Sequence, residues 1–194
     1  MAIQEKLYTV DDLWAMDNDP AYEDRYFYLI DGQLFEDAMP GRTHARLAVK
    51  IGRYLDEFAE GRGQGEVTSE CGYFPPDSRY TVLLPDVAYQ RFDRLPDPPP
   101  EGYVPQMPDL AVEIQSPSGS LVKMFRKAQA YLENGTALVW LVQPKRRGVE
   151  VCRLGEDGDI QSELLGPGDR LSGEDILPGF ELEISQLFNA VRGG

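Results

Sequence analysis

The sequence predicts one α/β domain, residues 1–194, in which helices flank a mixed β-sheet and antiparallel hairpins extend it. Three observations support this fold class. The composition, 42% hydrophobic and 27% charged over 194 residues, is that of a globular domain with a sizeable core. Segments 108–118, 121–134 and 137–142 follow the order strand, helix, strand with short connections, which predicts a parallel βαβ unit with a right-handed crossover. The Asp-Gly pair at 31–32 separates two apolar runs, which is typical of a hairpin turn.

The N-terminal third predicts a short helix, a hairpin and a long amphipathic helix. Thr9 caps the short helix 9–16, whose first turn carries acids where the helix dipole favours them. The hairpin covers 26–36. The long helix runs from about Thr43 to Ala59 and stops at a glycine-containing segment. Its apolar residues recur with the 3.6-residue period and are Leu47, Ala48, Ile51, Tyr54, Leu55 and Phe58.

The middle of the chain predicts two strands and a loop. The strands cover 66–74 and 80–89, and Pro85 inside the second one indicates a bulge, an edge position or a break, because proline cannot donate to a sheet ladder. Segment 93–108 contains too many prolines for regular structure. We interpret it as a surface loop near the site, either a lid or a partner-binding edge.

The C-terminal part extends the sheet. Strands at 149–153 and 160–165 follow the βαβ unit and predict an antiparallel extension. The tail, 171–188, contains a short strand at 180–184 and a last helical turn.

Composition also limits the class of protein. No apolar run approaches the roughly 18 residues that span a bilayer, and the N-terminus lacks the order of a secretory signal, so we expect a cytoplasmic protein without a membrane partner. Cys71 and Cys152 have no metal-ligand spacing with the single histidine, His44, and we interpret both as reduced. For His44, in the first turn of the long helix, a polar packing or capping role is favoured over a metal site.

The net charge of −14 weighs against nucleic-acid binding, because that affinity comes chiefly from Lys and Arg on phosphates. Most of the acids are explained by solubility. Binding would require a local basic patch. One basic stripe, Arg42, Arg46, Lys50 and Arg53, follows the long helix beside its apolar face. It is either a solvated flank or a set of phosphate contacts, in which case Arg42, Arg46 and Lys50 bind nucleic acid.

Two acids define the candidate site. Glu113 lies within the apolar strand after Pro108 and shares a strand face with Gln115, so it needs a cation, a metal ion or a strong donor beside it. Asp86 follows Pro85, where its strand is irregular. If the two strands are neighbours, the carboxylates converge, and their repulsion favours an oxygen-bound divalent cation, Mg²⁺ or Mn²⁺.

Such an ion activates water and stabilises charge on a phosphoryl oxygen. Lys127, two turns into the following helix, is the cation that reaches back over the strand ends, a role that Lys123 could share. Each residue also has a simpler interpretation. Asp86 could cap a turn, Glu113 could be a structural partner of Lys127, and Lys127 could be an ordinary helix lysine that extends toward solvent. Gln115 is better explained as a polar strand-end residue.

These residues carry a family resemblance. Pro85-Asp86 with Glu113-Ile114-Gln115 resembles the PD-(D/E)XK nuclease signature, and the wider pattern is similar to the Uma-type restriction-endonuclease family over roughly Tyr8 to Leu187. That pattern is Tyr28-Leu29-Ile30-Asp31-Gly32, His44, Pro85-Asp86-Val87-Ala88, Pro108-Asp109-Leu110-Ala111-Val112-Glu113, Ser116-Pro117-Ser118, Lys127, Tyr131, Gly135 and Trp140.

The resemblance implies a restriction-endonuclease-like core and metal-dependent hydrolysis of DNA. Asp86 and Glu113 would be metal ligands with the Ile114 carbonyl nearby, and Gln115 and Lys127 would complete the catalytic set. The sequence departs from the pattern in two places. Gln115 replaces the usual lysine, which here matches Lys127, and Tyr28 stands where the family tends to have Glu.

Two functions remain open from the sequence. The first is a Mg²⁺- or Mn²⁺-dependent DNA endonuclease, expected by analogy to form a homodimer because two sites serve two strands. The second is a catalytically inactive member of the same fold that acts as a binding or assembly module, which Tyr28, the acidic surface and the proline-rich loop favour.

Overall fold

A six-stranded mixed sheet forms the centre of the protein. The computed structural model describes residues 6–189. The strands lie in the order β3-β4-β5-β6-β7-β8. Only the pair β5–β6 is parallel, which confirms the predicted βαβ unit. The bounds are β3 Gly65–Thr68, β4 Val87–Arg91, β5 Leu110–Ile114, β6 Leu138–Gln143, β7 Gly148–Leu154 and β8 Ile160–Leu165.

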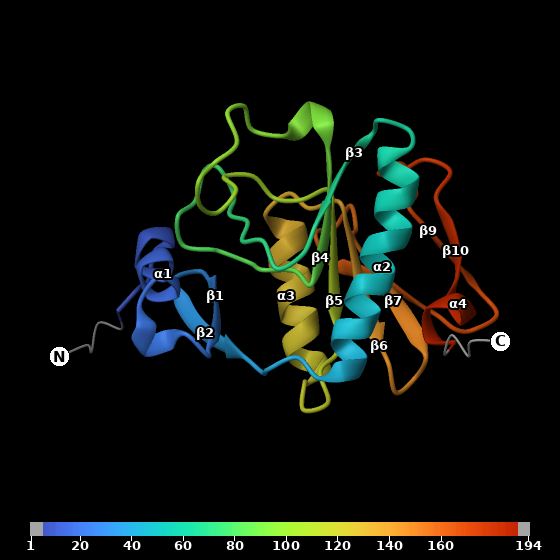
Figure 1. Ribbon diagram of the computed structural model, residues 1–194, viewed down its shortest axis with the longest axis horizontal. Helices are drawn as coiled ribbons and strands as arrows, with labels where there is room; N and C mark the ends of the chain where they lie inside the picture. The colour runs from blue at the N-terminus through green and yellow to red at the C-terminus, as the bar shows by residue number, and fades with distance from the viewer. Residues whose placement is uncertain (1–5, 190–194) are drawn as a thin grey trace.

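One long helix covers each face of the sheet. Figure 1 shows the sheet nearly edge-on, with α2 (Arg42–Glu60) and α3 (Leu121–Glu133) on opposite sides. Alternate residues of β5 enter two cores. Val112 packs with Leu47 under α2, whereas Ala111 packs with Ala128 under α3. All of β5 is buried, as an apolar run between two helical layers requires.

A smaller unit lies beside the sheet. Helix α1 (Val10–Asp17) begins at Thr9 with a capping box that Asp12 completes, and it packs on the hairpin of β1 (Tyr26–Ile30) and β2 (Gln33–Asp37). The hairpin turn is Asp31-Gly32, as predicted, and both residues have positive φ. A short 3-10 helix of one turn, η1 (Pro20–Tyr22), lies between α1 and β1.

The C-terminal segment forms a second small antiparallel pair. Strand β9 (Arg170–Ser172) pairs with β10 (Glu181–Glu183), and α4 (Ile184–Phe188) follows directly. These elements pack against the α2 face, where Leu171, Leu182 and Leu187 join the larger core. The described helices, all within 6–189, include none with the length and apolar character that crossing a bilayer demands.

The predicted strands at 66–74 and 80–89 are only partly correct. Regular strand is restricted to β3 and β4, and the chain between them makes single bridges, Tyr73 to Leu83 and Leu29 to Val82. Pro85 explains the limit, since it has no amide hydrogen to continue the ladder of β4. The break places Asp86 immediately before β4, at the edge of the regular sheet.

A buried ion pair anchors the proline-rich segment at the other end of β5. The short 3-10 helix η2 (Phe92–Arg94) presents Arg94 Nη1 to Asp109 Oδ1 at 2.5 Å, and Asp109 Oδ2 accepts a hydrogen bond from the Arg91 amide at 2.9 Å. The Asp109 side chain is only 3% exposed. The segment is therefore fixed to the sheet at its beginning and its end.

We expect Asp109→Ala to lower the free energy of unfolding by about 2–3 kcal/mol, because it leaves a half-buried guanidinium and a backbone amide without their acceptor. Urea denaturation followed by circular dichroism measures the change. The matched control is Asp93→Ala, which removes an exposed partner of Arg91 and should leave the midpoint almost unchanged. Equal effects of the two substitutions would contradict this anchoring role.

Candidate active site

The predicted acids meet in one cleft of about 400 Å³. Its walls are the hairpin β1–β2, the first turns of α2 and α3, and the adjacent ends of β4 and β5. Val87 pairs with Val112 in the antiparallel register of β4 and β5, so Asp86 and Glu113 are the next residues toward the cleft. The expectation that the two acids come from neighbouring strands of one sheet is confirmed.

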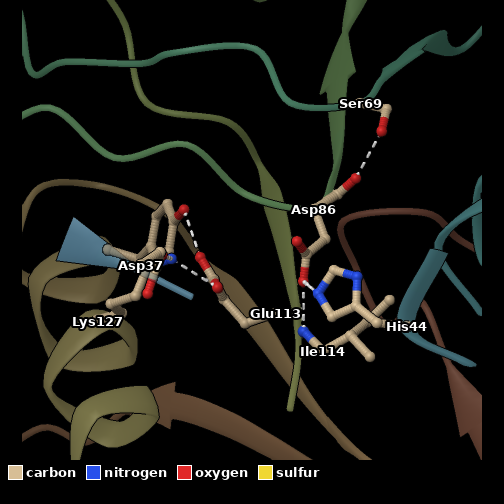
Figure 2. Close-up of polar contacts among 8 residues, drawn as sticks. Asp37, His44, Ser69, Asp86, Glu113, Ile114 and Lys127 are labelled. Atoms are coloured by element: carbon tan, nitrogen blue, oxygen red, sulfur yellow. Dashed lines mark hydrogen bonds and ion pairs between the residues drawn. The ribbon is translucent and has the colours of Figure 1, made fainter. Parts of the chain in front are cut away.

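Asp86 is held by two donors. Its Oδ2 accepts hydrogen bonds from the Ile114 amide at 2.6 Å and faces His44 Nε2 at 3.0 Å, as Figure 2 shows. Its backbone carbonyl accepts from Ser69 Oγ at 2.8 Å. Ile114 therefore contacts the site through its N–H. The Asp86 carboxylate is fixed in direction, and Oδ1 accepts no hydrogen bond from residues 6–189.

Glu113 is a buried carboxylate with a partner on each oxygen. Oε2 accepts from Lys127 Nζ at 2.7 Å and Oε1 accepts from the Tyr131 hydroxyl at 2.9 Å. Burial raises the pKa of Glu113 to about 7. The negative charge of Asp86 also raises this pKa, whereas the Lys127 cation lowers it. Tyr131 and Lys127 lie one helical turn apart on α3, so a single face of this helix holds the carboxylate.

Lys127 is buried as well, which makes the solvent-extended interpretation wrong. Its ammonium also donates to Asp37 Oδ2 at 3.0 Å and lies 4.9 Å from the centre of the Tyr28 ring. Burial would lower the pKa of Lys127, but the charges of Glu113 and Asp37 outweigh burial and raise it. Lys127 is therefore a permanent cation at the bottom of the cleft.

Asp37 was missed in the sequence. It is the last residue of β2, pairs in register with Tyr26, and brings a carboxylate to the same ammonium as Glu113. The only sequence signal is an acid at the end of the second hairpin strand. Periodicity within the hairpin cannot reveal that this end lies over α3. Asp37 therefore brings a carboxylate to the cleft from the same hairpin as Tyr28, the position at which the family resemblance leads one to expect Glu.

The remaining predicted residues have different positions. Gln115 lines the cleft, but its side-chain amide donates to the Gly119 carbonyl at 3.0 Å and so stabilises its own turn. Lys123 also lines the cleft. Arg42 and Arg46 are exposed on the first turns of α2. Lys50 is half-buried, and its ammonium donates to the carbonyl of Gln186 in α4.

His44 has a more specific place than packing or capping. It is 9% exposed, its Nε2 contacts Asp86, and its Nδ1 has no hydrogen-bond partner within the described part of the chain. Burial lowers the pKa of His44, but the hydrogen bond and charge of Asp86, together with Glu113 and Glu70, reverse the shift and raise it. The signal in the sequence was one histidine in the first turn of a helix, with nothing to indicate its partner.

The donor set suits a hard divalent cation. Five acidic residues line the cleft, Glu36, Asp37, Glu70, Asp86 and Glu113, and Oδ1 of Asp86 is free of hydrogen bonds from the described residues. No group of three or more His, Cys, Asp or Glu side chains within 6–189 is arranged to hold a metal ion. Mg²⁺ does not need such a cage, because it is commonly bound by one or two carboxylates, water and substrate phosphate.

A mixed sheet that presents Pro-Asp before one strand and Glu-Xaa-Gln on the next, with a helix lysine beside them, defines a restriction-endonuclease-like α/β protein. The family model described as "Putative restriction endonuclease", Uma2, matches residues 11–185, and the chain belongs to this family. None of the curated proteins matches it.

A solved structure supports the fold assignment. The crystal structure described as a "putative nuclease belonging to DUF820" from Anabaena variabilis has a TM-score of 0.75 and 22% sequence identity, and the alignment covers 93% of this chain and 97% of that one. The likeness extends over nearly the whole of both proteins and shows that they share the fold.

The raised pKa of His44 predicts a pH-dependent contribution to stability. Because the folded pKa lies above the unfolded value of about 6.5, this contribution is fully present below pH 6.5 and is lost as the pH rises through the folded pKa. Urea denaturation should therefore show a larger loss of stability for His44→Gln at pH 5.5 than at pH 9.

The chain offers a direct check, since His44 is its single histidine. Its imidazole resonances in a proton–nitrogen NMR titration need no assignment among several residues. A midpoint below 6.5 would contradict the ion pair with Asp86.

Proposed function

We propose that this protein is a divalent-metal-dependent endonuclease that hydrolyses phosphodiester bonds in DNA. The observation that carries the proposal is the meeting of Asp86, Glu113 and Lys127 in one cleft, from two adjacent strands and the helix that follows them. The family description, which names a restriction endonuclease, supports the same class of reaction.

Asp86 and Glu113, with the Ile114 carbonyl, would hold Mg²⁺ or Mn²⁺. When bound, the ion would lower the pKa of an attacking water and offset the charge that builds on the phosphoryl oxygens. Lys127 supplies a fixed positive charge to the same cleft and stabilises that negative charge further. Gln115 supports this arrangement by holding the turn after β5.

Four groups orient this set. His44 and the Ile114 amide direct the Asp86 carboxylate, and Tyr131 directs that of Glu113. Asp37 holds the Lys127 ammonium from the hairpin side. Such supporting contacts fix ligand geometry, which is necessary because a metal site tolerates little displacement. A homodimer with two clefts, one for each strand of DNA, remains part of the proposal by analogy.

A non-catalytic binding module is the second candidate. The observation that favours it is that both oxygens of Glu113 are already satisfied by Lys127 and Tyr131. A carboxylate so held can serve folding alone, as a structural ion pair. DNA cleavage and metal binding distinguish the two candidates.

Purified protein should cut plasmid or linear DNA when Mg²⁺ or Mn²⁺ is added, and EDTA should stop the reaction. We expect Asp86→Asn and Glu113→Gln each to reduce the rate by at least about 100-fold, since each removes a ligand charge from the cleft. Asp93→Asn, at an exposed ion pair outside the cleft, is the control and should retain the rate. Absence of cleavage across many DNA substrates with both ions would argue against the nuclease.

Binding of the ion can be measured without catalysis. A hundredfold excess of Mn²⁺ over its Kd adds about 2.7 kcal/mol to the stability of the folded state, which a thermal melt detects as a higher Tm. Asp86→Ala should lose this increase, whereas Asp93→Ala should keep it. A wild-type Tm that is indifferent to both ions would support the non-catalytic module.

A further inference from the structure

Ten of the 19 Lys and Arg residues of this acidic protein lie in three segments that contain no acid. The segments are 38–55, 114–132 and 134–149, and the chain as a whole has 33 Asp and Glu residues. They include the first turns of α2 and α3 and the turn between β6 and β7. Six of their exposed side chains form what we call the basic edge: Arg42, Arg46, Lys123, Lys145, Arg146 and Arg147.

The three segments meet at one end of the molecule. Strands β5 and β6 are parallel, so the turn 116–120 after β5 and the turn 144–147 after β6 leave the sheet on the same side. Lys145 Nζ lies 3.5 Å from the Pro117 carbonyl, and a Cβ placed on Gly41 would lie 3.6 Å from Pro117 Cγ. Figure 1 shows the N-terminal ends of α2 and α3 and this turn at the same end of the sheet.

The basic edge also borders the candidate active site. Ser116, Ser118 and Lys123 line the cleft that holds Asp86 and Glu113. Pro40 and His44 line the same cleft at the start of α2, where Arg42 lies between them in the sequence, and Lys145 lies next to Pro117 in the turn before α3.

Ion pairing differs between this edge and the rest of the surface. Elsewhere in the described chain, nine of the 12 Lys and Arg residues have a carboxylate partner, as in Arg25–Glu36, Arg79–Asp11 and Arg170–Glu181, and the exceptions are Lys50, Arg62 and Arg126. Within 6–189, no carboxylate lies within 4.0 Å of the charged groups of the basic edge. In a chain of net charge −14, this separation leaves a local positive surface.

Two backbone features add to the positive field. The first turns of α2 and α3 contain no acid, so the positive ends of both helix dipoles are uncompensated at this edge. On the same helix as Arg42, burial lowers the pKa of Lys50, and the charges of Arg46, a member of the basic edge, and of Arg53 lower it further. A polyanion on this surface would relieve that repulsion.

We propose that the basic edge is the docking surface for the phosphodiester backbone of a DNA duplex, which it positions across the cleft. This inference rests on the proposed function, because it names how the substrate of that site is held. The acidic cleft and its basic rim have complementary tasks. The basic edge neutralises the phosphates that flank the cleft. The carboxylates in the cleft bind the metal ion at the phosphate to be cleaved. The rim contacts phosphates, so it contributes affinity without sequence preference.

The test measures binding in the absence of cleavage. Fluorescence anisotropy of a labelled DNA duplex is recorded in EDTA at several salt concentrations, with the full chain. The variant Lys145→Gln/Arg146→Gln/Arg147→Gln removes three phosphate contacts. We expect weaker binding and a slope of log K against log salt that is shallower by about 2–3, since each contact contributes about 0.9 for duplex DNA.

The control changes the total charge equally at other places. Lys6→Gln/Arg62→Gln/Arg79→Gln removes three exposed cations away from the cleft, and it should keep the wild-type slope. Wild-type binding by the 145–147 variant, or equal losses in both triple variants, would overturn the docking surface. So would failure of the wild-type chain to bind duplex DNA at low salt.

The outcome is independent of catalysis. Salt-dependent binding that requires residues 145–147, in a protein that cuts nothing with Mg²⁺ or Mn²⁺, would support the docking surface and reject the nuclease. Metal-dependent cleavage with an unchanged salt slope in the 145–147 variant would support the nuclease and reject the docking surface.

Discussion

The interaction on which the site depends is the contact between the Lys127 ammonium and the Glu113 carboxylate inside the protein. Glu113 belongs to a strand that is buried on both faces, and an ionised acid there is stable only with a cation at hydrogen-bond distance. The parallel βαβ unit supplies that cation, because the helix after β5 packs back over the same strand. The local polarity of the cleft therefore results from the topology of the sheet.

The sequence was sufficient to predict the parallel pair β5–β6, because that pair depends on apolar periodicity and short connections. The meeting of Asp86 with Glu113 followed only if their strands were neighbours, which the structure shows. The sequence predicted that Lys127 reaches back over the strand ends from the following helix, but not that this side chain is buried. It was insufficient for Asp37 and for the partner of His44, whose contacts join segments more than 40 residues apart. It overestimated the strands around Pro85, since β-branched and aromatic residues there make isolated bridges in place of a ladder.

The hairpin β1–β2 has a larger part than its size suggests. It is a sheet of its own, connected to the rest through the bridge between Leu29 and Val82, and it forms one wall of the cleft. Tyr28 and Asp37 from its two strands both contact the Lys127 ammonium. The hairpin thus contributes the Tyr28 ring and the Asp37 carboxylate to the surroundings of Lys127, which is buried between α3 and the main sheet.

The position of Asp86 after a proline has a consequence for how such proteins diverge. The Asp86 side chain accepts a hydrogen bond from the Ile114 amide. It thereby replaces the backbone acceptor that is missing where the β4–β5 ladder ends. Replacing this acid would leave an interior N–H unsatisfied, whether or not any reaction takes place. A related protein without catalytic activity would still be under selection to retain this aspartate, because the folded state needs it. Its persistence in a lineage is accordingly poor evidence of activity.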